Sequence, residues 1–214
     1  MRKYFLTDCR SLELALDFPY ESMLAEARAL ADRFVEHRSS ESRGWDSLTL
    51  YGLSETQTGS WEEYGYASGQ AAKQHMGWTA IADCCPVTVK YFQKTFPSNS
   101  YGRVRFMRVR SGGWIGPHTD TNTPLIDNVN LVLNNPRGCV WHWDDIDQDF
   151  DMVPGKAYGM NISYSHSIHN HSSEDRYHMI VSRHDDTEQW QSLLLAAALK
   201  AGVQGQFIES DILP

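Results

Sequence analysis

The sequence predicts a mainly β protein with flanking helices, built on a double-stranded β-helix, which is a jelly-roll, cupin-like core. Short alternating runs of apolar and polar residues, separated by turn residues, follow one another from about residue 102 to residue 184. Amphipathic helical stripes stand before and after this stretch. A His-x-Asp triplet and a later histidine also have the separation that such a core requires.

Length and composition fit a single domain spanning residues 1–214. The chain is 41% hydrophobic and 12% aromatic, which is enough to build a substantial core. We expect residues 1–101 to form a helical and loop elaboration, residues 102–184 the double-stranded β-helix, and residues 185–214 a C-terminal helix and tail.

The charge and the apolar pattern exclude several classes of protein. A formal net charge of −8 offers no excess of Lys and Arg for a nucleic-acid backbone. No stretch reaches the roughly 18 apolar residues of a membrane span, and the start lacks the apolar segment of a signal peptide. The four cysteines form no Cys-x-x-Cys pair. We therefore expect a cytoplasmic protein with reduced thiols that binds neither nucleic acid nor membrane.

The first third of the chain shows two helical patterns and one strand. Tyr20–His37 carries a helical apolar stripe, Gly44–Leu53 a strand pattern, and Pro86–Lys94 a helix with proline in its first turn. Ser54–Gly77 is rich in Gly, Ser, Thr and Gln, which predicts a loop. The loop aromatics could line the mouth of a substrate site or fix the loop to the core; they are Trp61, Tyr64 and Tyr66.

The remaining strands and the last helix follow from alternation and turn residues. Gly112-Gly113 predicts a turn between a strand ending near Arg110 and the strand Trp114–Asp120. Five further strands are expected at 128–134, 139–143, 157–162, 166–171 and 177–183, and a helix at 187–201. The acidic run 144–151 lacks the glycine and terminal glutamate of a calcium loop and predicts a solvated turn.

Three polar faces in the β region each leave two interpretations open. Asn128 and Asn130 alternate with apolar residues, so their face either lines an internal ligand site or faces solvent. Arg103 and Arg105 share one strand face, and Arg108 and Arg110 another. These arginines form either a charged outer face or an inward anion site.

Spacing separates the three His-x-Asp triplets, which begin at His118, His142 and His184. In a double-stranded β-helix the distal histidine follows the triplet after four intervening strands, roughly 40 to 60 residues. His118 precedes His166 by 48 residues, His142 precedes it by only 24, and His184 has no histidine after it. Only the triplet at His118 therefore fits.

His118, Asp120 and His166 can occupy one face of an Fe(II) octahedron and leave three positions for substrate and oxygen. Strand alternation places His169 and His171 on the opposite face from His166. Arg176, ten residues after His166, could anchor a dicarboxylate co-substrate.

Four segments resemble the aspartyl/asparaginyl β-hydroxylase family of Fe(II)/2-oxoglutarate oxygenases, which includes free-proline hydroxylases: RVRFMRVRSGGWIGPHTDTN, NPRGCVWHW, VPGKAYGMN and SYSHSIHNHSSEDRYHMIV. The resemblance implies a double-stranded β-helix in which His118, Asp120 and His166 bind iron. It also implies that Arg176 pairs with the distal carboxylate of 2-oxoglutarate, and that Asn130 stands where a histidine contacts this co-substrate in other members. Fe(II), 2-oxoglutarate and O2 would be required, with ascorbate supportive in vitro.

The departures from the family pattern indicate the substrate. Peptide-modifying members have Gly where this chain has Asp120, and halogenating relatives of the wider superfamily also lack this carboxylate. Peptide-modifying members also carry arginines where this chain reads Ile126–Asn130. The resemblance therefore implies a hydroxylase of a small molecule, a free amino acid or a derivative. The alternative is a jelly-roll protein that binds a metal or small ligand without oxygen chemistry.

Overall fold

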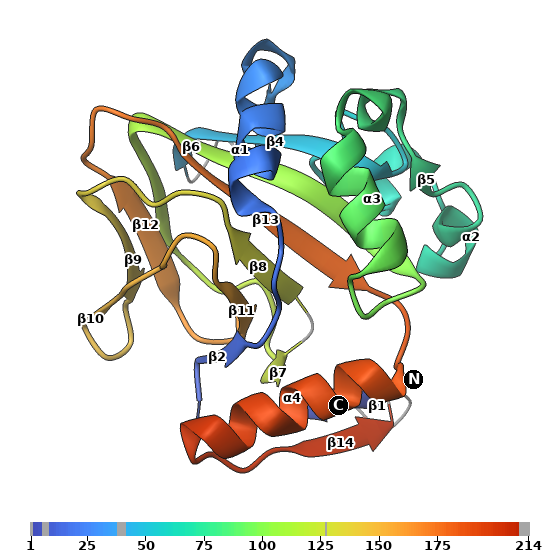
Figure 1. The fold of residues 1–214 in the computed structure, drawn as a ribbon, viewed down its shortest axis with the longest axis vertical. Helices are drawn as coiled ribbons and strands as arrows, with labels where there is room; N and C mark the ends of the chain where they lie inside the picture. Colours follow the sequence, from blue (N-terminus) through green and yellow to red (C-terminus); the bar gives the residue numbers. More distant parts are fainter. Residues whose placement is uncertain (1, 6–8, 38–41, 127, 210–214) are drawn as a thin grey trace.

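The computed structural model of the chain describes residues 2–5, 9–37, 42–126 and 128–209, and it is mainly β (Figure 1). The strands are β1 (Arg2–Phe5), β2 (Ser11–Leu14), β3 (Val35–Glu36), β4 (Ser42–Gly52), β5 (Gly77–Trp78), β6 (Tyr101–His118), β7 (Leu125–Ile126), β8 (Asn128–Val132), β9 (Cys139–Trp143), β10 (Gln148–Phe150), β11 (Ala157–Met160), β12 (His166–Asn170), β13 (Arg176–Arg183) and β14 (Gln206–Glu209). The α-helices are α1 (Tyr20–Ala29), α2 (Gly69–Lys73), α3 (Pro86–Lys94) and α4 (Glu188–Ala201).

One antiparallel sheet carries the core, in the order β10-β9-β12-β6-β13-β8-β11-β2, with β4 pairing to β6. The first half of β6 pairs with β13, and its second half pairs with β12. Because one strand serves both halves, the sheet curls on itself, and the jelly-roll fold expected from the sequence is confirmed. β2 and β4 extend this sheet with residues from the first 101 positions.

The predicted turn at Gly112-Gly113 is wrong, because β6 continues through these residues as one strand. Gly112 has a φ of +69°, and a Cβ on Gly113 would come within 2.8 Å of two backbone carbonyl oxygens. The pairing with β4 shifts register here, since Arg43 pairs with Trp114 but Trp45 pairs with Val109. The two glycines therefore form a bulge that bends the strand between the two halves of the sheet.

The predicted helix 20–37 is also too long. Helix α1 ends at Ala29, and a short 3-10 helix, Ala31–Arg33, follows it. Val35 then pairs with Ser47 of β4, so sheet pairing overrides the helical stripe in this segment. Helix α3 has the predicted bounds, whereas the predicted loop 54–77 contains the short helix α2.

Two layers of apolar residues result from the alternation along the strands. Val104 and Phe106 of β6 pack with Leu131 under the helices, whereas Met107 and Val109 pack with Trp141 inside the jelly roll. Helices α1 and α3 lie over β4, β6 and β13, and α4 lies at the opposite end of the molecule (Figure 1).

A second sheet of three strands, in the order β14-β1-β7, joins the two ends of the described chain. Strands β1 and β14 were not predicted from the sequence, because both depend on pairing between distant segments. No helix in the described ranges is long and apolar enough to cross a membrane.

Candidate active site

Three potential metal ligands meet where β6 ends and β12 begins. The pairing of the two strands sets His118 opposite His166, and the backbone N–H of Asp120 donates to the carbonyl of Ile162 at 3.0 Å. One ligand atom from each of His118, Asp120 and His166 lies within 4.8 Å of the other two. The Nε2 of His166 is 4.0 Å from an Oδ of Asp120. In the described part of the chain, this is the group that could hold a metal ion.

Hydrogen bonds fix which nitrogen of each histidine faces this point. The Nδ1 of His118 lies 2.8 Å from the carbonyl of Gly116, and the Nδ1 of His166 lies 3.0 Å from the carbonyl of Tyr164. A carbonyl can only accept, so both Nδ1 atoms carry the proton and both Nε2 atoms keep a lone pair. Burial lowers the pKa of His166, which also favours the neutral form that a metal requires. Two neutral imidazoles and a carboxylate form a ligand set suited to Fe(II).

Two tryptophans lie beside the histidine rings. Trp141 of β9 lies parallel to His166, with ring centroids 4.8 Å apart and an interplanar angle of 3°. Trp45 of β4 lies 6.2 Å from the ring of His118. Both indoles line the same cavity, and their Nε1 atoms are buried without a hydrogen-bond partner among the described residues.

The cavity between the two halves of the sheet has a volume of about 280 Å³, and all three potential ligands line it. Asn128 and Asn130 also line it, so the polar face of β8 points inward. Arg103 and Arg105 line it as well. The face of Asn128 and Asn130 and the face of Arg103 and Arg105 therefore contribute to an internal site.

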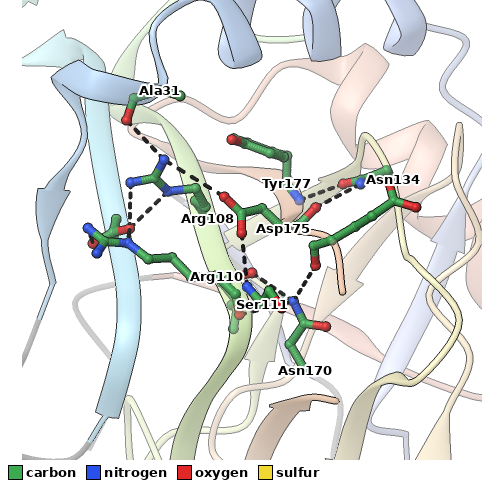
Figure 2. Close-up of polar contacts among 11 residues, drawn as sticks. Ala31, Arg108, Arg110, Ser111, Asn134, Asn170, Asp175 and Tyr177 are labelled. Carbon is green, nitrogen blue, oxygen red and sulfur yellow. Dashed lines mark hydrogen bonds and ion pairs between the residues drawn. The ribbon is translucent and has the colours of Figure 1, made fainter. Parts of the chain in front are cut away.

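Arg108 and Arg110 point to the other side of β6. The Nε atoms of both arginines donate to one carboxylate oxygen of Asp46, at 2.9 and 2.7 Å, and Arg108 also donates to the carbonyl of Ala31 (Figure 2). These two arginines therefore stabilise the pairing of β4 with β6 and are held away from the cavity.

Arg176 is fully buried at the start of β13, on the inward face of the strand, with 1% of its surface exposed. Its Nη1 donates to the Nδ1 of His178 at 3.2 Å, and its Nη2 has no hydrogen-bond partner among the residues described. Burial lowers the pKa of Arg176, and the nearby Cys139 acts in the opposite direction. A guanidinium in this state has an unused donor for an anion.

His178 connects Arg176 to the cavity, since it lines the cavity and Arg176 does not. Burial, followed by the charges of Arg176 and Arg105, holds the pKa of His178 well below its usual value. Its Nδ1 accepts from Arg176, so the neutral ring carries its proton on Nε2. His178 was not predicted from the sequence, although its position two residues after Arg176 places both on one strand face.

Hydrogen bonds on both sides of Arg176 fix the start of β13 (Figure 2). The side chain of Asn134 donates to the carbonyl of Asp175 at 3.0 Å and accepts from the N–H of Tyr177. The N–H of Ser111 donates to the carboxylate of Asp175 at 2.9 Å. Because both neighbours are held, Arg176 keeps its inward direction.

The other predicted features lie outside the cavity. His142 is 2.8 Å from the carboxylate of Asp149, and the stacked rings of His169 and His171 are 5.6 Å apart on the outer side of the sheet. The expected alternation along β12 is therefore confirmed.

The loop aromatics do not line the cavity. The hydroxyl of Tyr64 accepts from the N–H of Thr58, and Tyr66 lies 5.2 Å from His75. They contact their own loop, so a substrate mouth formed by these side chains is not supported.

Two histidines and a carboxylate that could hold a metal ion inside a jelly roll are typical of the class of non-haem Fe(II) oxygenases. The model of the aspartyl/asparaginyl β-hydroxylase family matches residues 19–185, and the chain belongs to this family. It is thus an enzyme, a 2-oxoglutarate-dependent dioxygenase, and the alternative of a jelly-roll protein without oxygen chemistry is set aside.

No curated protein matches the sequence. Among solved structures, a Pseudomonas putida prolyl-4-hydroxylase is 14% identical, with a TM-score of 0.47, over 83% of this chain and 95% of its own. A viral collagen prolyl hydroxylase from Paramecium bursaria Chlorella virus-1 is 11% identical, with a TM-score of 0.41, over 82% and 96%. A 2OG-Fe(II) oxygenase family oxidoreductase from Burkholderia pseudomallei is 15% identical, with a TM-score of 0.41, over 78% and 81%.

Proposed function

We propose that this dioxygenase hydroxylates a free amino acid or an amino-acid derivative, with His118, Asp120 and His166 as the ligands of Fe(II). The observation that carries the proposal is the convergence of these three side chains within 4.8 Å, with both Nδ1 atoms engaged by backbone carbonyls. When bound, Fe(II) and 2-oxoglutarate couple decarboxylation of the co-substrate to succinate with transfer of one oxygen atom of O2 to a C–H bond.

We assign Arg176 and Asn130 to the co-substrate. Arg176 has an unused Nη2 donor in a fully buried position, and the dicarboxylate of 2-oxoglutarate supplies the anion that this donor requires. His178 would present its Nε2–H to the same carboxylate from the cavity wall. Asn130 is 2% exposed on the adjoining strand β8, where its amide NH2 could donate to the co-substrate.

The cavity supports a small substrate. Its volume of about 280 Å³ has to hold the co-substrate as well, which favours a small substrate. The resemblance to peptide-modifying members also fails in the segment Ile126–Asn130, of which Asp127 lies outside the described residues. Around the metal ligands, the ring of Trp141 stacks on His166 and that of Trp45 lies beside His118.

Succinate formation tests the proposal directly. The protein is incubated with Fe(II), 2-oxoglutarate and ascorbate, first alone and then with each common free amino acid. We expect slow succinate formation alone and faster formation with one amino acid or a few. If an acidic peptide stimulates turnover more than every free amino acid, the substrate assignment is wrong.

We also propose that the protein works in the cytoplasm with reduced cysteines. All four cysteines are free thiols in the structure, and two of them, Cys85 and Cys139, are buried. Purification without reductant should therefore yield four titratable thiols per unfolded chain.

A further inference from the structure

The triplet His142-Trp143-Asp144, which its spacing excludes as a metal motif, ends directly behind the proposed metal site. Strands β9 and β12 lie side by side, and Trp143, the last residue of β9, pairs with His166 of β12 (Figure 1). Asp144 follows where β9 ends, and its backbone N–H donates to the carbonyl of Ser165 at 3.0 Å. The acid at the end of this triplet therefore lies beside the segment that carries a proposed metal ligand.

The carboxylate of Asp144 bridges the two residues that flank His166. The hydroxyl of Ser165 donates to one carboxylate oxygen at 3.1 Å, and the hydroxyl of Ser167 donates to the other at 2.8 Å. Asp144 and Ser167 line a groove on the outer side of the sheet, whereas His166 lines the cavity on the inner side. The bridge thus holds the backbone of His166 from the outside while its imidazole points inward.

Pairing between strands is interrupted at His166. The pairing of β12 with β6 sets His166 opposite His118 but Ile168 opposite Ile115, so the register shifts between the two positions. Such a bulge disrupts the hydrogen bonds of the ladder and changes the direction of nearby side chains. On the other side, β9 ends opposite His166. The two charge-assisted hydrogen bonds of Asp144 therefore act where the sheet constrains the backbone least.

The turn that precedes β12 supplies a backbone carbonyl to two of the three proposed ligands. The carbonyl of Ile162 accepts from the N–H of Asp120 at 3.0 Å, and the carbonyl of Tyr164 lies 3.0 Å from the Nδ1 of His166. Asp144 holds the end of this turn through both its backbone N–H and its carboxylate. A displacement of the turn would therefore change the positions of both ligands.

We propose that Asp144 is a positioning residue of the metal centre, which holds His166 and the turn before it in the arrangement that the metal requires. The proposal rests on the proposed function, because it takes His118, Asp120 and His166 as the ligands. Asp144 acts through Ser165 and Ser167, and its own carboxylate lies outside the cavity.

The structure gives a physical reason for an effect on metal affinity. One ligand atom from each of His118, Asp120 and His166 already lies within 4.8 Å of the other two, so the site is organised before a metal enters. Without the bridge from Asp144, metal binding would also have to order the segment around His166. Part of the binding free energy would be lost to this ordering, and the dissociation constant would rise.

The affinity of the metal-free protein for Fe(II) tests the proposal without any turnover. Fe(II) binding is measured by anaerobic equilibrium dialysis, and thermal melting checks that each metal-free variant is folded. We expect Asp144→Ala to raise the Kd for Fe(II) about 10- to 100-fold. Asp144→Asn should recover part of this loss, because its amide oxygen can still accept from one hydroxyl.

Two further variants separate positioning from charge. Replacing both Ser165 and Ser167 by alanine removes the bridge and keeps the carboxylate, so this double variant should raise the Kd as Asp144→Ala does. Asp149→Ala is the matched control. Asp149 lines the same outer groove and carries the same charge, but its carboxylate bonds to His142. Its Kd for Fe(II) should stay within about twofold of wild type.

Three outcomes would overturn the inference. The first is a Kd for Fe(II) in Asp144→Ala within about twofold of wild type, whatever its melting temperature. The second is an equal rise in Asp149→Ala, which would reveal only the loss of a negative charge. The third is an unchanged Kd in the double serine variant, which also decides the matter if Asp144→Ala does not fold. By contrast, a wild type that binds no Fe(II) would reject the proposed function itself, and the inference with it.

Discussion

Replacement of Arg176 by methionine should separate co-substrate binding from stability. The change removes a fully buried guanidinium and leaves an apolar side chain of similar length. If Arg176 anchors 2-oxoglutarate, the variant should bind this co-substrate poorly. If Arg176 only supports the fold, the variant should instead melt at a lower temperature.

The structure gives the expected size of both effects, the loss of affinity for 2-oxoglutarate and the change in stability. Loss of a charge-assisted contact in a desolvated site costs about 2 to 5 kcal/mol, which is roughly 30-fold to several thousand-fold in affinity. The stability effect has the opposite sign. The variant loses one hydrogen bond, from Arg176 Nη1 to His178, worth about 1 kcal/mol. It also loses a buried cation for which the described residues provide no paired carboxylate, and burying such a cation costs several kcal/mol.

The assay compares wild type, Arg176→Met and Arg176→Lys by thermal melting and by the KM for 2-oxoglutarate. We expect Arg176→Met to melt no lower than wild type while its KM rises at least about 30-fold. Arg176→Lys should recover only part of the affinity, because an ammonium cannot reproduce the two-donor fork. An unchanged KM in Arg176→Met would refute the assignment, and Arg105 would then be the first alternative, since Arg108 and Arg110 are held by Asp46.

Three further predictions concern the framework of the site. Asp46→Ala should lower the free energy of unfolding by about 3 to 5 kcal/mol in urea denaturation, because the buried Arg108 loses its closer charged partner and keeps only Asp175 at 3.9 Å; a loss below about 1 kcal/mol would contradict this. The depressed pKa of His178 means that the unfolded state binds a proton more readily, so stability should fall as pH drops below about 6.5, and His178→Gln should flatten this fall between pH 5 and 6.5. At pH 8, a thiol reagent should modify the exposed Cys84 in the native protein but not the buried Cys85, whose pKa burial raises to about 12; equal rates would be inconsistent with the structure.

The strands that carry the site were predictable from the sequence because alternation and turn residues are local signals. The bounds of β9 match the prediction, and those of β12 differ by one residue. The 48-residue spacing also selected His118 and His166, which the structure sets opposite each other. Local patterns were sufficient where each strand is bounded by a clear turn.

Features that depend on pairing between distant segments were not predictable. The glycine pair at 112–113 is typical of a hairpin turn, and only the register with β4 shows that it forms a bulge. The pairing of distant strands also decides whether a polar face points into the cavity or away from it. Arg105 and Arg108 differ only in the side of β6 that they occupy. Trp45 lies far from the metal motif in sequence and reaches the site through the β4–β6 pairing.

The most direct test of the central claim is the Fe(II) content of the protein together with its 2-oxoglutarate turnover. The wild type and Asp120→Ala are compared after anaerobic loading and removal of free iron, with His169→Ala as a control from the outer face of β12. We predict one Fe(II) per chain and succinate formation in the wild type and in His169→Ala. In Asp120→Ala we predict loss of turnover with an unchanged melting curve. Full iron binding and full turnover in Asp120→Ala would contradict the assignment of the metal site.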